Sequence, residues 1–291
     1  MAHETVFLSG KGGTGKTSLT SCFAFLAKEQ AVMVDCDVDA ADLHLMLNPS
    51  LKNKTEYYSG SMPEINNDLC IKCGLCVERC PFDALKLGDK VTAELLECEG
   101  CGYCKLVCPQ NAVVMRKRLT GYIFESSTNY GQHFIHAKMT AGAENSGKTV
   151  TELKKRARTF SEKNQNKFIL IDGSPGIGCP VISSISDTDS IVIIIEATQT
   201  GYRDYLRVSD LVKRFSKNVS VIINKFDLNP ETTEKIMKDI AERDDKVIGK
   251  LNYSAKFTEA VKQGIPYAEL YDDEITEEIK SIWNKIKEDV I

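Results

Sequence analysis

A glycine-rich segment near the N-terminus constrains the fold of this chain more than any other feature. Residues 10–17 read Gly-Lys-Gly-Gly-Thr-Gly-Lys-Thr and fit the pattern G-x-x-x-x-G-K-T. The segment follows a short β-rich run at 5–8 and precedes an apolar stretch with helical periodicity at 18–27. Strand, glycine loop and helix in this order form a phosphate-binding loop, because backbone N–H groups and the helix N-terminus surround an anion. The sequence therefore predicts an α/β domain with a nucleotide site.

Two side chains of this loop have expected roles. Lys16 should reach the β- and γ-phosphates, and the Thr17 hydroxyl should be a ligand of Mg²⁺. The surrounding loop residues should close around the phosphate oxygens through their backbone N–H groups. These are Gly12, Gly13, Thr14, Gly15 and Ser18.

Apolar runs rich in Ile and Val alternate with helical segments over much of the remaining chain. We expect strands at 31–34, 168–171, 191–195 and 219–223, with two further strands at 121–126 and 133–139. Helices are expected at 148–163, 205–215, 231–242 and 274–289. Such alternation indicates a mostly parallel sheet that helices cover on both faces. After Asn48-Pro49 the pattern decays through polar residues up to Gly60.

Cysteines are concentrated in one part of the chain. Eight of the 11 lie between Cys70 and Cys108. Because cytosolic thiols stay reduced, such a block indicates a metal site more than a disulfide framework. Residues 70–81 and 98–109 both read C-x2-C-x2-C-x3-C-P, which is an internal repeat. We therefore expect an insert at about 59–117 that interrupts one α/β domain formed by 1–58 and 118–291.

The repeated run is that of bacterial two-cluster ferredoxins, in which the fourth cysteine of each run ligates the other [4Fe–4S] cluster. The expected ligands of one cluster are Cys70, Cys73, Cys76 and Cys108, and those of the second are Cys98, Cys101, Cys104 and Cys80. Two zinc sites are the alternative, because C-x2-C pairs also bind zinc. Zinc gives no reason for the third cysteine of each run or for the proline after the fourth.

Charge and hydropathy argue against several classes of protein. The chain has 37 Lys and Arg against 41 Asp and Glu, a net charge of −4, which does not favour binding to nucleic acid or to a membrane surface. No apolar run reaches the roughly 18 residues that a membrane span needs. The first residues lack the basic and apolar regions of a secretory signal. We expect a soluble, cytoplasmic protein.

Lys11 adds a second lysine to the phosphate loop. The sequence Lys-Gly-Gly-Thr-Gly-Lys-Thr resembles the deviant Walker A signature of the MinD/ParA/nitrogenase-iron-protein family of P-loop ATPases. The whole chain resembles those members of the MinD superfamily that contain an inserted two-cluster ferredoxin domain. The resemblance implies a dimer, homo- or heteromeric, with nucleotide at the interface, in which Lys11 reaches the partner's phosphates. A solvated loop lysine is the alternative.

Three further segments match this family. Residues 34–39 stand where its first switch begins, which implies Asp37 near the attacking water and Mg²⁺, with Asp39 as a second candidate. Residues 169–176 match its second switch, which implies Asp172 near Mg²⁺ and the Gly176 backbone near the γ-phosphate. In residues 221–227, Asn224 stands where the family contacts adenine. The same N-K-x-D pattern reads guanine in regulatory GTPases, so GTP stays the alternative to ATP or ADP.

Three cysteines lie outside the block. Cys22 and Cys36 are expected to be core thiols. Cys179 follows the second-switch aspartate and has two interpretations. It is either a small buried thiol or, as in the nitrogenase iron protein, a ligand of a cluster that two subunits share.

Two functions follow from these parts. In the first, ATP hydrolysis by Lys11, Lys16, Asp37 and Asp172 drives a dimer rearrangement that gates electron transfer through the clusters to a redox partner. In the second, the protein assembles or delivers Fe–S clusters to client proteins. Complete sets of four thiolates favour electron transfer. A spatial-positioning ATPase is disfavoured, because residues 274–289 are acid-rich and unlike a membrane-targeting helix.

Overall fold

The computed structural model describes residues 1–38, 40–140, 146–215 and 217–288. Asp39 and the loop residues 141–145, which the sequence analysis singled out, lie outside the described residues. The chain divides into two compact units. The first unit contains Met1–Lys54, Phe124–Ala137 and Gly147–Ile291, and the second contains Thr55–Ile123 and Lys138–Ser146.

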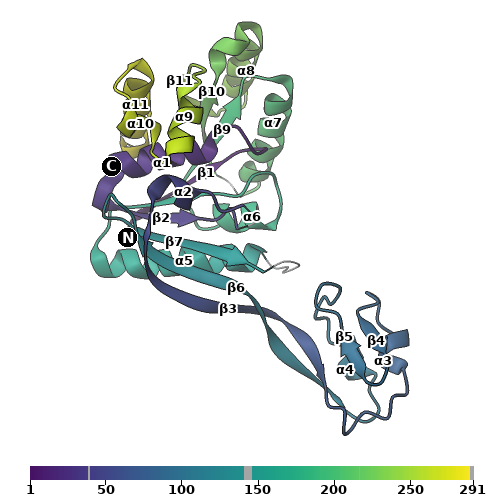
Figure 1. The fold of residues 1–291 in the computed structure, drawn as a ribbon. Coiled ribbons are helices and arrows are strands. Elements are labelled where there is room, and N and C mark those ends of the chain that lie inside the picture. The colour runs from purple at the N-terminus through teal and green to yellow at the C-terminus, as the bar shows by residue number, and fades with distance from the viewer. Residues whose placement is uncertain (39, 141–145, 216, 289–291) are drawn as a thin grey trace. The chain divides into compact units, whose positions relative to one another are not determined.

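The chain forms a sheet of nine strands in the order β11-β10-β9-β1-β8-β2-β7-β6-β3, of which β3 and β6 lie partly in the second unit (Figure 1). The strands are β1 (His3–Leu8), β2 (Ala31–Asp35), β3 (Ser50–Ile65), β6 (Val113–Ser127), β7 (His133–Met139), β8 (Phe168–Asp172), β9 (Ser190–Glu196), β10 (Val219–Asn224) and β11 (Lys246–Leu251). Every neighbouring pair from β11 to β7 is parallel. The expected mostly parallel α/β fold is confirmed.

Helices cover both faces of this sheet. They are α1 (Lys16–Ala27), α2 (Leu43–Leu47), α5 (Ser146–Asn164), α6 (Cys179–Ile185), α7 (Gln199–Lys213), α8 (Pro230–Glu242), α9 (Lys256–Gln263), α10 (Tyr267–Leu270) and α11 (Glu274–Glu288), with 3₁₀ turns η1 (Lys28–Gln30) and η2 (Phe226–Leu228). On one face, Phe7, Leu170 and Ile194 pack with α1, α10 and α11 in one core cluster. The alternate strand residues point to the opposite face, where α6 and α7 lie against β1 and β9. No helix in the described ranges is both long and apolar enough to cross a membrane.

Strand β3 corrects the sequence-based expectation for the segment after Asn48-Pro49. This segment has no apolar periodicity, yet it forms a strand of 16 residues, Ser50–Ile65. Most of its side chains are exposed, and it lies at the edge of the sheet. An edge strand with little burial does not need the alternating apolar residues by which a strand is recognised.

The second unit contains the repeated cysteine runs. Besides parts of β3 and β6, it contains the antiparallel pair of β4 (Leu85–Leu87) with β5 (Val91–Ala93) and the short helices α3 (Leu75–Glu78) and α4 (Tyr103–Leu106). Gly74 precedes α3 and Gly102 precedes α4, with φ of 77° and 74°. Each glycine occupies the same position of its run, so the sequence repeat is also a repeat of backbone conformation.

Candidate functional site

The phosphate loop connects β1 to α1. Gly15 has a left-handed backbone with φ of 95°, and a Cβ atom there would lie 2.5 Å from Asn224 Nδ2. Only glycine fits this position without moving the asparagine. The Thr14 hydroxyl is buried and has no hydrogen-bond partner in the part of the chain that the structure describes. An orphaned buried hydroxyl fits a loop whose partner is a bound anion.

A lysine, a threonine and an aspartate meet at the end of β8. Lys16 Nζ donates to Oδ1 of the buried Asp172 at 2.7 Å, and Thr17 Oγ1 donates to Oδ2 at 2.7 Å. Burial by itself lowers the pKa of Lys16, but the charge of Asp172 and the hydrogen bond to it raise this pKa above its ordinary value. An ammonium and a hydroxyl on one carboxylate, beside the phosphate loop, are the groups that phosphate and Mg²⁺ require.

Two more carboxylates follow β2. Asp37 Oδ2 lies 3.9 Å from Lys16 Nζ, so Asp37 shares this lysine with Asp172. Asp35, for which no role was expected, is fully buried and accepts hydrogen bonds from the backbone N–H groups of Asp37 and Leu43. Burial and the charge of Asp172 raise the pKa of Asp35 well above its usual range. The sequence feature that points to Asp35 is the presence of acids at the alternate positions 35 and 37.

The second lysine of the loop, Lys11, forms an ion pair within its own chain. Lys11 Nζ lies 3.1 Å from Oε2 of Glu196 at the end of β9, and 3.4 Å from Thr200 Oγ1. Lys225 pairs with the other oxygen of Glu196. Sequence reasoning missed both Glu196 and Lys225 as members of the site, because neither contact follows from a motif.

An open pocket of about 230 Å³ lies beside the phosphate loop. Its lining comes from the loop, the start of α1, the end of β10, the segment between β11 and α9, and α9 itself. The residues are Gly13, Gly15, Ser18, Asn224, Lys225, Asn252, Tyr253, Ser254, Phe257, Thr258 and Val261. Asn224 Nδ2 donates to Thr14 O at 2.8 Å, which fixes this predicted base-contacting residue against the loop. Gly12 is exposed on the loop.

Asp227, the acid of the N-K-x-D pattern, binds the backbone of Tyr253 through its side chain. Its Oδ1 accepts a hydrogen bond of 2.6 Å from the Tyr253 N–H, and Asp227 does not line the pocket. A carboxylate that reads guanine must offer its oxygens to the base. One of these oxygens is already used by the protein.

The loop after β8 touches the phosphate loop. The Gly176 N–H donates to Ser9 O at 2.9 Å, so the predicted second switch contacts the start of the phosphate loop. Cys179, at the start of α6, is exposed, and the expectation that it is a buried thiol is wrong. It lies at the end of a surface loop, where the chain enters the helix. Cys22 and Cys36 are fully buried as expected, and burial raises the pKa of both thiols.

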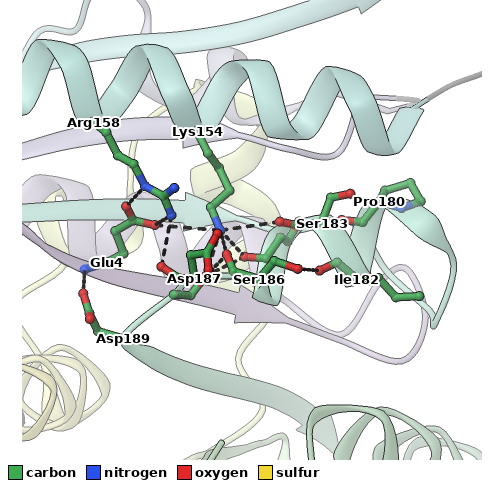
Figure 2. Close-up of polar contacts among 11 residues, drawn as sticks. Glu4, Lys154, Arg158, Pro180, Ile182, Ser183, Ser186, Asp187 and Asp189 are labelled. Atoms are coloured by element: carbon green, nitrogen blue, oxygen red, sulfur yellow. Dashed lines mark hydrogen bonds and ion pairs between the residues drawn. The ribbon is translucent and has the colours of Figure 1, made fainter. Parts of the chain in front are cut away.

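A buried lysine holds the helix that follows this loop. Figure 2 shows Lys154 and Arg158 reaching from α5 toward the end of α6 and toward Glu4. Lys154 Nζ donates to Ser184 O at 2.7 Å and to Thr188 Oγ1 at 2.9 Å, and it also bonds Ser186 O. Its cationic charge stabilises the negative C-terminal end of α6.

In the second unit, each predicted set of four cysteines surrounds one cavity. Cys70, Cys73, Cys76 and Cys108 line the first, and Cys80, Cys98, Cys101 and Cys104 line the second. Burial and the neighbouring thiols of Cys108 and Cys70 raise the pKa of Cys76. Among the residues that the structure describes, no three or more Cys, His, Asp or Glu side chains converge as a single metal ion requires.

Comparison with known proteins identifies relatives of this chain. The family model of the CobQ/CobB/MinD/ParA nucleotide-binding domain matches residues 5–267. An uncharacterized protein of Methanocaldococcus jannaschii, MJ0578, is 39% identical over 228 residues, which is 78% of this chain and 79% of the relative.

Solved structures of the same fold include two MinD proteins. The MinD cell division protein of Aquifex aeolicus is 18% identical, with a TM-score of 0.58 over 99% of this chain and 97% of its own. The septum site-determining protein MinD of Pyrococcus horikoshii, complexed with Mg-ADP, is 16% identical, with a TM-score of 0.58 over 98% of this chain and 96% of its own. At these identities the likeness shows the fold.

Proposed function

The chain belongs to the CobQ/CobB/MinD/ParA nucleotide-binding family and is a P-loop ATPase of the MinD/ParA type, and on this premise we propose that it couples ATP hydrolysis in a dimer to electron transfer through two [4Fe–4S] clusters. The observation that carries the electron-transfer part is the lining of the two cysteine cavities. Each cavity is lined by three cysteines of one run and the fourth cysteine of the other run. Two-cluster ferredoxins arrange their ligands in the same way.

The nucleotide part rests on the cluster at the end of β8. Lys16 and Thr17 are held on Asp172, and the Thr14 hydroxyl has no partner among the described residues. When ATP binds, Lys16 would move from the carboxylate to the phosphates, and Thr17 and Asp172 would lie at Mg²⁺. The Pyrococcus horikoshii MinD structure holds Mg-ADP, which supports ADP and Mg²⁺ as ligands here.

We favour ATP over GTP because of the base pocket. Asp227 accepts the Tyr253 N–H and does not line the pocket, whereas the Asn224 side chain does. The pocket also contains Phe257 and Val261, which suit the flat apolar face of adenine.

The proposed cluster domain comprises residues 59–117. When bound, each cluster accepts and donates one electron at a time. The chain's own contribution is to hold eight thiols in two sets, each with three cysteines from one run and one from the other. The partner would be a redox protein.

Delivery of Fe–S clusters to client proteins is the second candidate. The exposed Cys179 at the start of α6 favours it, because an exposed thiol can take part in an additional labile site. Complete sets of four cysteines oppose it, since clusters with four thiolates are held firmly.

Spatial positioning is the third candidate, because the similar solved structures include cell division proteins. In this chain, the apolar side of α11 is already buried: Ile279, Ile282, Trp283 and Ile286 belong to the core. Within residues 274–288, the apolar side of this helix is therefore not available to a membrane surface, as an interfacial amphipathic helix would require.

The test is the metal content of the protein purified without oxygen. We expect about eight iron and eight sulfide per chain, as two [4Fe–4S] clusters require. Replacing Cys108 by Ser should affect the same cluster as replacing Cys70, because both line one cavity, and electron paramagnetic resonance of the reduced protein would compare them. Zinc without iron in the anaerobic protein would refute the cluster proposal and leave the ATPase assignment intact.

A further inference from the structure

We propose that Glu196 holds the Lys11 ammonium inside its own subunit and thereby sets the concentration at which two ATP-loaded subunits associate. The inference rests on the proposed dimer, in which Lys11 reaches the partner's phosphates. Glu196 is a positioning residue, because it acts on the reaction through Lys11.

The Glu196 carboxylate bridges two lysines. Oε2 lies 3.1 Å from Lys11 Nζ, and Oε1 is bonded by Lys225 Nζ. The side chain is 13% exposed, against 37% for Lys11. The two ammonium groups lower the pKa of Glu196 against the opposing effect of burial, so the carboxylate is charged at neutral pH. The charge of Lys11 is therefore neutralised within its own subunit.

The two lysines differ in how firmly they are held. Lys225 follows β10 and its Nζ also lies 3.4 Å from Gly13 O. Lys11 lies in the open loop, and its additional contact is the Thr200 hydroxyl at 3.4 Å. When Lys11 leaves, Glu196 keeps Lys225 as its counter-ion. The departure therefore leaves no uncompensated charge in a mostly buried position, which would be costly.

A second subunit with bound ATP offers Lys11 a stronger anion than Glu196. The triphosphate has several negative charges and multiple oxygen acceptors, whereas Glu196 offers one oxygen of a carboxylate that Lys225 already compensates. ADP lacks the terminal phosphate and offers less. Competition by Glu196 thus weakens the association of both ATP-bound and ADP-bound subunits. Association of the ATP-bound subunits stays favoured, because only the triphosphate gives Lys11 contacts that compensate for the broken ion pair.

The test is Glu196→Gln in the full-length protein, with association measured by sedimentation velocity in Mg²⁺ and a slowly hydrolysed ATP analogue. Glutamine keeps the size of the side chain and an oxygen acceptor but removes the charge. We expect the dimer dissociation constant to fall by about two- to fivefold, the change that one partly exposed ion pair accounts for. In the Lys11→Ala background, the same substitution should have no effect on association.

The matched control is Glu125→Gln. Glu125 also holds two basic side chains, Arg156 and His133, but it lies on β6, four strands from β1 in the sheet. This variant should associate as the wild type does. An unchanged or weaker dimer in Glu196→Gln overturns the inference, and so does equal tightening with and without Lys11, which would assign the effect to Lys225. If Lys11→Ala alone leaves association and hydrolysis unchanged, the proposed role of Lys11 fails and this inference fails with it.

Discussion

At the residue scale, the protein holds the two lysines of the phosphate loop very differently. The Lys16 side chain is 6% exposed and lies on Asp172, with Asp37 also within ion-pair distance. Its removal leaves the buried Asp172 carboxylate without this cation, which costs about 3–5 kcal/mol. Removal of Lys11 leaves Glu196 paired with Lys225 and costs little stability. A change in activity is therefore easier to interpret at Lys11 than at Lys16.

We predict that Lys11→Ala binds ATP normally but hydrolyses it roughly 10²–10³-fold more slowly, because it removes charge that is needed mainly in the transition state. Lys16→Ala should lose nucleotide binding and also unfold at lower denaturant concentration. Equilibrium binding and steady-state phosphate release separate the two effects. Lys238→Ala, on the exposed side of α8, is the control and should behave as wild type. Hydrolysis at the normal rate in Lys11→Ala would remove the basis for a lysine acting across the interface.

At the scale of elements, the sequence predicts the strands that are buried on both faces and misses a strand that is mostly exposed. Strand β8 is buried along its whole length, and its apolar run predicted 168–171 within one residue of the observed Phe168–Asp172. Strand β3 escaped prediction because most of its side chains face solvent. Its place beside β6 depends on backbone hydrogen bonds, which have the same chemistry in every sequence.

The residues of the candidate nucleotide site were also predicted only in part. Lys16, Thr17 and Asp172 were predicted because each stands at a fixed place in a motif, next to a strand end. Glu196 was not, because its contact with Lys11 depends on β9 lying beside β1, with Ile193 opposite Leu8. Strand order in a sheet is a property of the whole fold, and no local pattern encodes it.

The α5–α6 pair gives a prediction about stability. Lys154→Met should lower the free energy of unfolding by about 2–4 kcal/mol, because Ser184 O, Ser186 O and Thr188 Oγ1 would lose a buried donor. Glu4 would not be left alone, since Arg158 also pairs with it (Figure 2). Urea unfolding of the nucleotide-free protein measures the change.

The control for this prediction is the neighbouring residue. Lys155 is exposed on the same helix, and Lys155→Met should stay within about 0.5 kcal/mol of the wild type. Equal effects at the two positions would mean that the bonds of Lys154 to α6 do not contribute to stability.

At the scale of the whole molecule, the chain passes between the two units within β3 and within β6, and again at 137–138 and 146–147. Strand β2 ends at Asp35, and after α2 the chain continues into β3, which runs from the first unit into the second. The chain returns to the first unit within β6, between Ile123 and Phe124. The second-unit segment Lys138–Ser146 precedes Gly147 of α5, and α5 holds α6 through Lys154. Because the chain is continuous between the units, we hypothesise that nucleotide binding and cluster reduction influence each other. A measured coupling free energy between the two events would establish this.

We predict that the midpoint potential of at least one cluster differs between the ADP state and the state with a non-hydrolysable ATP analogue. A coupling of about 1–3 kcal/mol, the usual allosteric range, shifts a one-electron potential by roughly 40–130 mV. Coupling of binding free energies is reciprocal, so reduction of that cluster must change nucleotide affinity by the same factor. Anaerobic redox titration monitored by electron paramagnetic resonance measures the shift, and nucleotide binding to the oxidised and reduced protein measures the reciprocal effect.

Equal potentials in both states, together with equal access of a chelator to the iron, would mean that the nucleotide has no effect on the clusters. Equal potentials with a change in chelator access would instead favour cluster delivery, because nucleotide would then control release and not electron flow.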